Sequence, residues 1–305
     1  MQVKALWAGI GAGALWGFSV LAPKLTWNYD FWDVSFGRYV FYGIISFVHL
    51  ALNYRSRKQW MTANALWTSF FFSLIANTVY YTLLVYCARR SGIALTSLMV
   101  GLIPVTVAIF GRTADLPFRR IAGPIALLTL GIFVLEWQEV RNLGHWDWVG
   151  FGLLVFEITI WTWYAIENAK FMKRNPKITG LIWSSLSGVT TLTSMVVAWG
   201  IYKYFWGEQW VAPVSEATPA TLTTFLWVVA ICGLGGSWVA FAWWNYASQV
   251  LKTSLTGQLM IFETLFALAY GWIYAGRFPT AHEIVATLLF VTGVRWSIKT
   301  AKTAG

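Results

Sequence analysis

The chain has few charged residues. Asp, Glu, Lys and Arg make up only 11% of its 305 residues, whereas 58% are hydrophobic. A soluble globular domain carries about 25% charged residues, so this chain could not cover a surface that faces water. The composition therefore predicts an integral membrane protein. Its apolar residues form long runs rather than short alternating ones, which favours transmembrane helices over a β-barrel.

Residues that carry metal or redox chemistry are also scarce. The three histidines, His49, His145 and His282, are scattered, and the chain has no glycine-rich nucleotide loop. These absences argue against an ATP-driven pump and predict neither a metal site nor a cofactor. Cys87 and Cys232 both fall in predicted helices and are expected to be free core thiols. We see no cluster of catalytic polar residues, so we expect no enzyme.

The apolar runs predict ten transmembrane helices. Their approximate spans are 5–25, 33–53, 66–88, 92–111, 120–137, 147–170, 179–202, 222–246, 254–275 and 281–299. With the N-terminus in the cytoplasm, 15 of the 22 Lys and Arg residues fall on the cytoplasmic side and 7 fall outside. Positive charge concentrates on cytoplasmic loops, so both termini are expected in the cytoplasm. The same loops explain the net charge of +10 without nucleic-acid binding.

Two stretches of the chain align without a gap, residues 80–111 and 240–271. Thr96 falls on Thr256, because the offset is 160 positions (256 − 96 = 160). The identities are few. An internal repeat nevertheless determines the architecture of a protein, so even this weak one is informative.

The repeat divides the ten helices into five plus five, residues 1–140 and 141–305. An odd number of spans forces the second half to insert upside down relative to the first. We therefore expect an all-α integral membrane protein whose ten transmembrane helices form two inverted five-helix repeats in one membrane domain. Inverted repeats are typical of secondary transporters, whose substrate site lies near the midplane. The alternative is a duplicated membrane protein that transports nothing.

Polar and aromatic side chains share one face of the third predicted helix. An unpaired polar group facing lipid is costly, so this face is expected to line a cavity. The equivalent face of the eighth helix and one tryptophan of the sixth complete the predicted wall. The predicted substrate-binding residues are Asn77, Tyr80, Tyr81, Trp163, Ser237, Phe241 and Trp244. Aromatic faces can hold an ammonium or stack on a ring, although Trp and Tyr also anchor helices at membrane interfaces.

Small residues and a proline suggest where helices approach closely or bend. Gly13 and Gly17 lie four positions apart on the first helix, which allows another helix to pack closely and could also provide a sliding surface. Pro104 frees a carbonyl in the preceding turn of the fourth helix. It is expected to act as a hinge, to expose a carbonyl to substrate, or to form a fixed kink.

Three of the charged residues inside predicted helices are candidates for a function. Glu157 and Glu263 are the buried acids, and an ionisable residue within the membrane is a functional candidate by default. Glu263 could carry a coupling proton, attract an ammonium, or be a protonated structural group. Arg38 is placed near the outer end of the second helix, where it either pairs with Asp33 or extends to the membrane surface.

Four stretches resemble one known family, and one of them is Arg38 followed by YVFYG, which resembles the second helix of that family, where an arginine comes first. The run ALWGFSVLAPK at 14–24 resembles the first helix of the drug/metabolite transporter superfamily, in its EamA-type branch, and 91–111 and 254–278 resemble its helices 4 and 9. The aromatic-rich pattern is most similar to the YddG-type amino-acid exporters. The resemblance implies inverted five-helix repeats, cytoplasmic termini and amino-acid export. The chain departs from the family in having Thr264 after Glu263, where proline is usual.

We therefore expect a transporter of the bacterial inner membrane that exports amino acids, including aromatic ones, by alternating access. Its expected partners are amino-acid substrates and membrane lipids, with no nucleic acid, and a monomer is the expected form. The alternatives are export of other small metabolites or organic cations, a channel-like protein, and a membrane enzyme. The substrate list, the energy source, the oligomeric state and the most stable conformation stay open.

Overall fold

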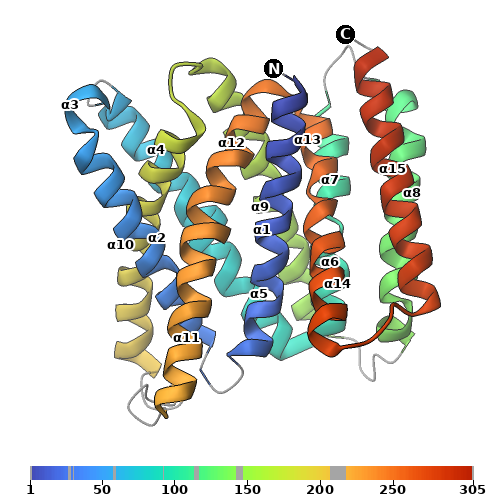
Figure 1. Ribbon diagram of the computed structural model, residues 1–305, viewed down its shortest axis with the longest axis horizontal. Helices are drawn as coiled ribbons and strands as arrows, with labels where there is room; N and C mark the ends of the chain where they lie inside the picture. Colours follow the sequence, from blue (N-terminus) through green and yellow to red (C-terminus); the bar gives the residue numbers. More distant parts are fainter. Residues whose placement is uncertain are drawn as a thin grey trace.

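The computed structural model describes residues 2–26, 29, 31–57, 60–91, 93–112, 117–141, 147–206 and 218–303. All regular secondary structure in these residues is helical, and the helices stand side by side as one bundle (Figure 1). The prediction of an all-α protein is confirmed.

Within the described residues the helices join into ten rods, if the single turn α3 (Tyr54–Arg57) is set aside. The first five are α1 (Gln2–Leu25), α2 (Phe31–Leu52), α4 (Ala63–Ser73) continued by η2 (Leu74–Val79) and α5 (Tyr80–Ser91), α6 (Ile93–Gly101) with α7 (Ile103–Phe110), and α8 (Phe118–Arg141). The second five are α9 (Trp148–Arg174), α10 (Gly180–Trp206), α11 (Pro219–Ile231) continued by η4 (Cys232–Val239) and α12 (Ala240–Val250), α13 (Thr253–Leu259) with α14 (Ile261–Ala275), and α15 (Ala281–Thr303). Each rod overlaps one of the ten predicted spans.

Eight of these described rods are long and apolar enough to cross a membrane. The rod α4–η2–α5 falls short, and α6–α7 contributes only a shorter apolar segment, Leu98–Phe110. The chain is therefore a multi-pass membrane protein. The full count of ten transmembrane spans stays a prediction.

Several helix ends follow from local sequence. Thr62 and Thr218 cap α4 and α11, each accepting a hydrogen bond from a backbone N–H three residues later. Asp147 caps α9 by accepting from the backbone N–H of Val149, two residues later. Gly276 ends α14 in the left-handed conformation (φ 59°), which glycine adopts without a steric penalty.

The fourth predicted helix, 92–111, is broken in the structure. α6 ends at Gly101 and α7 begins at Ile103, with Pro104 in its first turn. Proline lacks the N–H that a continuous helix would use there, and the carbonyl of Leu102 instead starts the new helix by accepting from Val105 and Thr106. Pro104 therefore sits at a real break, and its role as a hinge stays a prediction.

The packing brings α1 against the second half of the chain. It lies against α12 and against α14, while α9 lies against α5 and α7. α2 packs on α10 and η4, and α8 pairs with α15 at one edge of the bundle (Figure 1). The main buried cluster includes four tryptophans: Trp16, Trp161, Trp183 and Trp244.

The predicted close approach at the first helix is confirmed. A Cβ added at Gly13 would lie 2.7 Å from Cβ of Phe262 and 3.0 Å from the backbone N of Glu263. A Cβ at Gly17 would lie 2.8 Å from the backbone N of Ala267 and 2.9 Å from the carbonyl O of Glu263. α1 and α14 therefore meet backbone to backbone, as small residues at four-residue spacing permit.

Candidate functional site

Two segments of the bundle are π-helical, η2 and η4. A π-helical turn is wider than an α-helical one and is frequent at functional sites. The predicted site residues Asn77 and Ser237 lie in these two segments, one in each. They are 160 positions apart (237 − 77 = 160), which is the offset of the sequence repeat. The sequence analysis did not predict these segments, because no residue pattern distinguishes them from an ordinary helix.

The hydrogen bonds at the end of the two π-helical segments also correspond. The N–H of Tyr80 donates to the carbonyls of Ile75 and Asn77. The N–H of Ala240 donates to those of Gly235 and Ser237, again 160 positions further along. The same local departure from α-helical geometry therefore occurs at equivalent places in both halves of the chain.

Arg38 lies among these elements. Its Nε donates to Oγ of Ser237 at 2.9 Å, and its Nη2 donates to the carbonyl of Gly236 at 3.4 Å. The rings of Tyr39 and Tyr81 lie 5.7 and 5.9 Å from the guanidinium carbon, within the range of cation–π attraction. The expectation that Arg38 extends to the membrane surface is wrong, because these contacts hold it between α2 and η4. Its type and position were visible in the sequence as an intramembrane charge.

Aromatic rings from three helices meet beside this arginine. Trp16 packs against Phe241 with ring centroids 5.6 Å apart and against Trp244 at 5.4 Å. Tyr42 stacks on Phe241 at 6.2 Å. Phe241 and Trp244, both predicted site residues, are thus together in the core. The sequence analysis missed Trp16 as a site residue, although the Trp-Gly pattern of 14–24 was the available signal.

A second aromatic group forms where α5 meets α9. Tyr80 packs against Trp161 with centroids 6.0 Å apart, and Trp161 packs against Tyr164 at 5.8 Å. Trp163, the predicted third wall, is 41% exposed and packs against Phe71. Successive residues of an α-helix are about 100° apart, so Trp163 points about 200° away from Trp161. The structure therefore does not bring Trp163 to Tyr80, and Trp161 takes that place.

If the protein transports an aromatic substrate, as the sequence predicts, replacing Trp161 by Ala is expected to weaken that transport at sub-saturating concentration. In the wild type the ring of Trp161 supports that of Tyr80. Such a ring pair contributes roughly 0.5–1.5 kcal/mol beyond the burial of its area, and the substitution removes it. The matched control is Trp163→Ala on the same helix, which should transport nearly as wild type. Initial rates in liposomes measure both. The reverse order of effects would restore the sequence prediction and contradict the placement of the wall at Trp161.

Asn77 is buried and donates from Nδ2 to Oγ1 of Thr191 at 2.9 Å. The next residue, Thr78, bonds to Ser194 at 2.8 Å. Both contacts tie η2 to α10. The amide of Asn77 therefore holds two helices together, and its predicted contact with substrate stays a prediction.

The two acids occupy different surroundings. Glu157 is completely buried in α9, and neither carboxylate oxygen has a hydrogen-bond partner among the described residues. Glu263, in the first turn of α14, is partly exposed, and its carboxyl group forms no hydrogen bond or ion pair with another described residue. Their roles as coupling or structural acids stay predictions.

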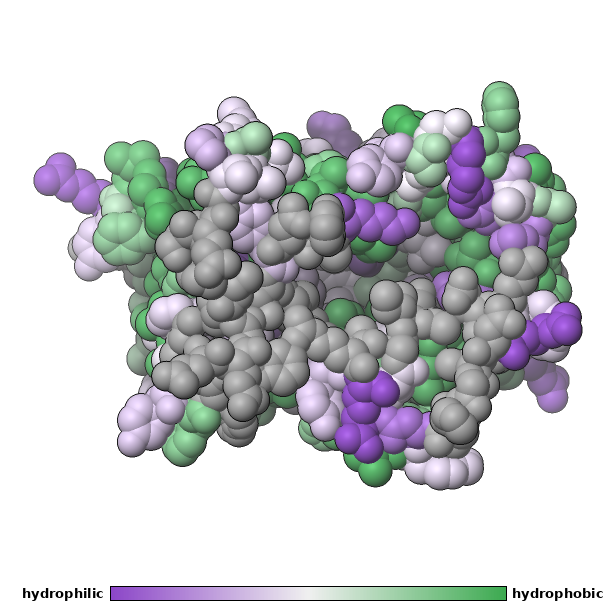
Figure 2. All heavy atoms as spheres, turned by 90° about the horizontal axis from the view of Figure 1, so that it is seen from below, coloured by the Kyte–Doolittle hydropathy of each residue, from purple (hydrophilic) through white to green (hydrophobic). Residues whose placement is uncertain are grey.

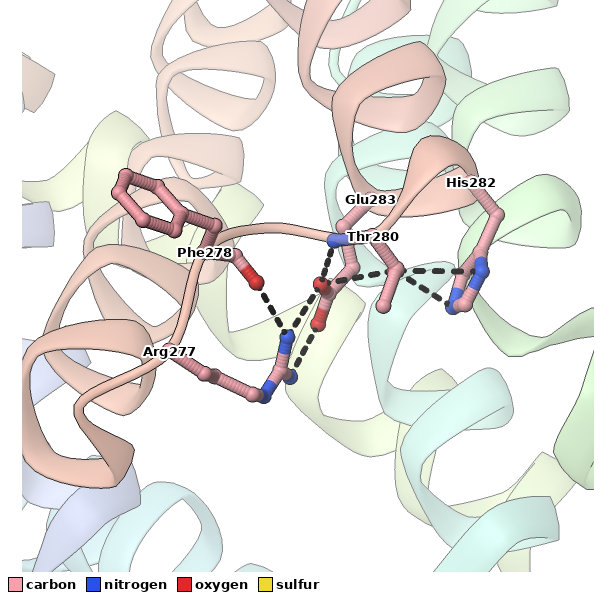
Figure 3. A network of polar contacts seen from close by, with 5 residues as sticks. All are labelled: Arg277, Phe278, Thr280, His282 and Glu283. Carbon is pink, nitrogen blue, oxygen red and sulfur yellow. Dashed lines mark hydrogen bonds and ion pairs between the residues drawn. The ribbon is translucent and has the colours of Figure 1, made fainter.

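Two ion pairs lie at the lower end of the bundle. Arg277 and Glu283 bond through two N–O pairs, 2.8 and 2.7 Å apart (Figure 3). Glu283 also accepts from the N–H and the hydroxyl of Thr280, so it caps α15. Arg90 at the end of α5 pairs with Asp147 at 2.8 Å. Backbone hydrogen bonding at the start of α9, together with Arg90, lowers the pKa of Asp147 below its usual value.

The lower end is also where the bundle is open. The face seen from below is hollowed towards its middle, with hydrophilic and apolar side chains interspersed around it (Figure 2). Every residue of α14 from Phe262 to Trp272 is partly exposed, whereas every residue of α13 is buried. α13 is sealed against α7, where Ser254 donates to the carbonyl of Ala108 at 2.8 Å. The helices are therefore closed together at one end and looser at the other.

The described residues contain no group of three His, Cys, Asp or Glu side chains placed to hold a metal ion. Chemically, the arrangement offers one inward-facing cation, two acids without hydrogen-bond partners among the described residues, and two groups of aromatic rings. Such groups can bind a small charged or aromatic molecule.

Comparison with known proteins adds to this description. No family model matches the chain. The inner membrane protein YtfF of Escherichia coli (strain K12) is 27% identical over 299 residues, which cover 93% of this chain and 91% of that protein. A solved structure, described only as the crystal structure of a protein, is similar with a TM-score of 0.76, at 17% identity and over 99% of both chains. That likeness shows a shared fold over the whole chain.

Proposed function

We propose that the chain is a secondary transporter of the inner membrane that exports amino acids, including aromatic ones, by alternating access. Ten spans in two inverted five-helix repeats, 1–140 and 141–305, would build it. The proposal rests on one observation. The helices of the two halves make corresponding contacts, and charged and aromatic side chains face inwards between them. The similarity to an inner membrane protein over most of the chain supports the location.

The helix contacts support the inverted repeat. If residues 141–305 repeat residues 1–140, then α9 corresponds to α1, α10 to α2, and the rod α11–η4–α12 to α4–η2–α5. The contact of α1 with α12 then has its counterpart in that of α9 with α5, and the contact of α1 with α14 in that of α9 with α7. In Figure 1 the rod α4–η2–α5 runs downwards and α11–η4–α12 runs upwards. Corresponding rods of opposite direction are what inversion requires.

A bundle closed at one end and looser at the other suits a transporter better than a channel. A carrier exposes its site to one side at a time, near the plane where the repeats meet. With the termini in the cytoplasm, the sealed contact of α13 with α7 would face the cytoplasm and the hollowed face would face outwards. Both termini lie at the same end of the bundle, as an even number of spans requires (Figure 1).

Counterflow in liposomes tests the proposed function. Vesicles loaded with unlabelled phenylalanine should accumulate labelled phenylalanine transiently and with saturation, because a carrier exchanges its substrate. A linear, unsaturable flux would indicate a channel, and conversion of the label into a product would indicate an enzyme. Accumulation of an organic cation or another metabolite in place of amino acids would select those alternatives. Repeating the assay with a pH gradient tests whether protons are coupled.

Orientation gives a separate prediction. Cysteine introduced at exposed Lys177, in the α9–α10 turn, should react with a membrane-impermeant maleimide only after the cells are opened. Cysteine introduced at exposed Ala281, at the start of α15, should react in intact cells. Cys87 and Cys232 are buried and should give little background. Labelling of Lys177→Cys in intact cells would overturn the proposed orientation.

A further inference from the structure

We infer that Arg38 and Glu263 are the two ends of a recognition site for a zwitterion, with Arg38 binding the carboxylate of an α-amino acid and Glu263 binding its ammonium. The inference rests on the proposed function and assigns the two charged ends of its substrate to particular residues. The reason is that neither Arg38 nor Glu263 forms an ion pair within the described structure.

Arg38 has binding capacity that the protein does not use. A guanidinium carries five N–H donors, and here the partners are Ser237, Gly236 and the hydroxyl of Tyr81, none of which is a carboxylate. Arg38 forms no ion pair with a carboxylate in the described part of the chain. A partly buried cation without a counter-charge is costly within a membrane. A carboxylate that arrives with the substrate would supply that counter-charge with charge-assisted hydrogen bonds.

Glu263 is an acid without a basic partner among the described residues. Its carboxyl group is partly exposed and accepts no hydrogen bond from another described residue. Both residues lie beside α1. The carbonyl of Gly236 accepts a hydrogen bond from Arg38, and a Cβ added at Gly236 would lie 2.5 Å from Oγ of Ser19, whereas a Cβ added at Gly17 would lie 2.9 Å from the carbonyl O of Glu263. The two side chains form no ion pair with each other in the described structure, and such a pair of opposite charges matches a ligand that carries both signs. The backbone contacts of Gly13 and Gly17 hold the first turn of α14 in place, so the position of the acid is set by α1.

The rings beside Arg38 suit an aromatic side chain. Tyr81 faces the guanidinium of Arg38, and Tyr80 precedes Tyr81 on α5. Trp161 supports Tyr80 from α9. An organic cation would need the acid and the rings but would gain nothing from Arg38. An anionic metabolite would use Arg38 but would be repelled by Glu263, so the pair favours a zwitterion over both.

Competition in liposomes tests the assignment. Uptake of labelled phenylalanine is inhibited with phenylalanine, with phenylalaninamide, which lacks the carboxylate, and with 3-phenylpropionate, which lacks the ammonium. In the wild type both analogues should compete at least about tenfold more weakly than phenylalanine, as expected for loss of a hydrogen bond to a charged group. Arg38→Gln should weaken inhibition by phenylalanine about tenfold or more and leave inhibition by phenylalaninamide unchanged. Glu263→Gln should weaken inhibition by phenylalanine and leave inhibition by 3-phenylpropionate unchanged.

The matched control is Arg90→Gln, which removes a surface arginine paired with Asp147 and should leave all three inhibition curves as in the wild type. Where a variant transports too little labelled substrate, direct binding of the three compounds to purified protein gives the same comparison. If Arg38→Gln weakens phenylalanine and its amide equally while the protein remains folded, Arg38 is a packing residue and the inference is wrong. If Arg38→Gln does not fold, the Glu263→Gln arm decides alone. Failure of the wild type to bind any amino acid would overturn the proposed function itself.

Discussion

Replacing Gly17 by Leu is expected to abolish transport and to lower the thermal stability of the protein. A Cβ at this position would lie 2.8 Å from the backbone N of Ala267 and 2.9 Å from the carbonyl O of Glu263. Backbone atoms cannot rotate away as a side chain can, so α1 and α14 would have to separate. Overpacking of this kind typically costs about 1–3 kcal/mol and sometimes more. Melting of the purified protein in detergent and counterflow in liposomes measure the two effects.

The matched control is Gly152→Leu on α9. A Cβ at Gly152 meets no atom within 4 Å, so this larger side chain has room. Leucine is also a better helix former than glycine by up to about 1 kcal/mol, which should leave stability unchanged or slightly raised. If Gly17→Leu melted and transported like Gly152→Leu, the close approach of α1 to α14 would not exist in the membrane.

The positions of the helices were predictable because they depend on local properties. Ten long apolar runs lie where the structure has ten rods, since a segment must hide its backbone polar groups from lipid wherever it packs. The contact between α1 and α14 was also foreseeable in kind. Gly13 and Gly17 have no side chain to keep a neighbour away, although the sequence did not say which helix that neighbour is.

The rotation of each helix about its axis was harder to predict. Trp161 and Trp163 differ by two positions, and both are aromatic residues deep in the same segment. In a membrane helix both the lipid face and the core face are apolar, so hydrophobicity does not identify the inner one. The buried stripe of α9 does so in the structure, and it contains Glu157 and Trp161 but not Trp163.

The environment of Arg38 was missed for a related reason. An arginine seven residues into α2 can extend along the helix to the membrane surface or turn inwards. The choice depends on acceptors supplied by distant parts of the chain, here Ser237 and Gly236 in η4. The π-helical geometry of η4 likewise depends on packing. The only sequence signal for η4 is the repeat: most of its residues lie 160 positions after those of η2, so a known π-helical segment at η2 would have suggested one at η4.

Replacing Trp183 by Ala is expected to destabilise the protein by about 3 kcal/mol, at the lower end of the range for removing a buried aromatic side chain. Trp183 is 1% exposed and stacks on Phe171 with centroids 4.3 Å apart. Its Nε1 donates to Oδ1 of Asn168 at 2.7 Å, and Asn168 in turn donates to Asn245. The substitution therefore leaves both a cavity and a buried carbonyl without its donor. Thermal melting or unfolding in denaturing detergent measures the loss.

Two further variants separate these causes. Trp183→Phe keeps a six-membered ring in the site but leaves the buried acceptor of Asn168 without its donor, so it should cost about 1–3 kcal/mol and less than Trp183→Ala. Trp227→Ala removes a tryptophan that is 67% exposed on α11 and should change stability least, because lipid takes the place of the ring without leaving a cavity. The expected order of destabilisation is thus Trp183→Ala, then Trp183→Phe, then Trp227→Ala. Equal effects of the first and third variants would mean that Trp183 faces lipid and that α9, α10 and α12 do not meet around it.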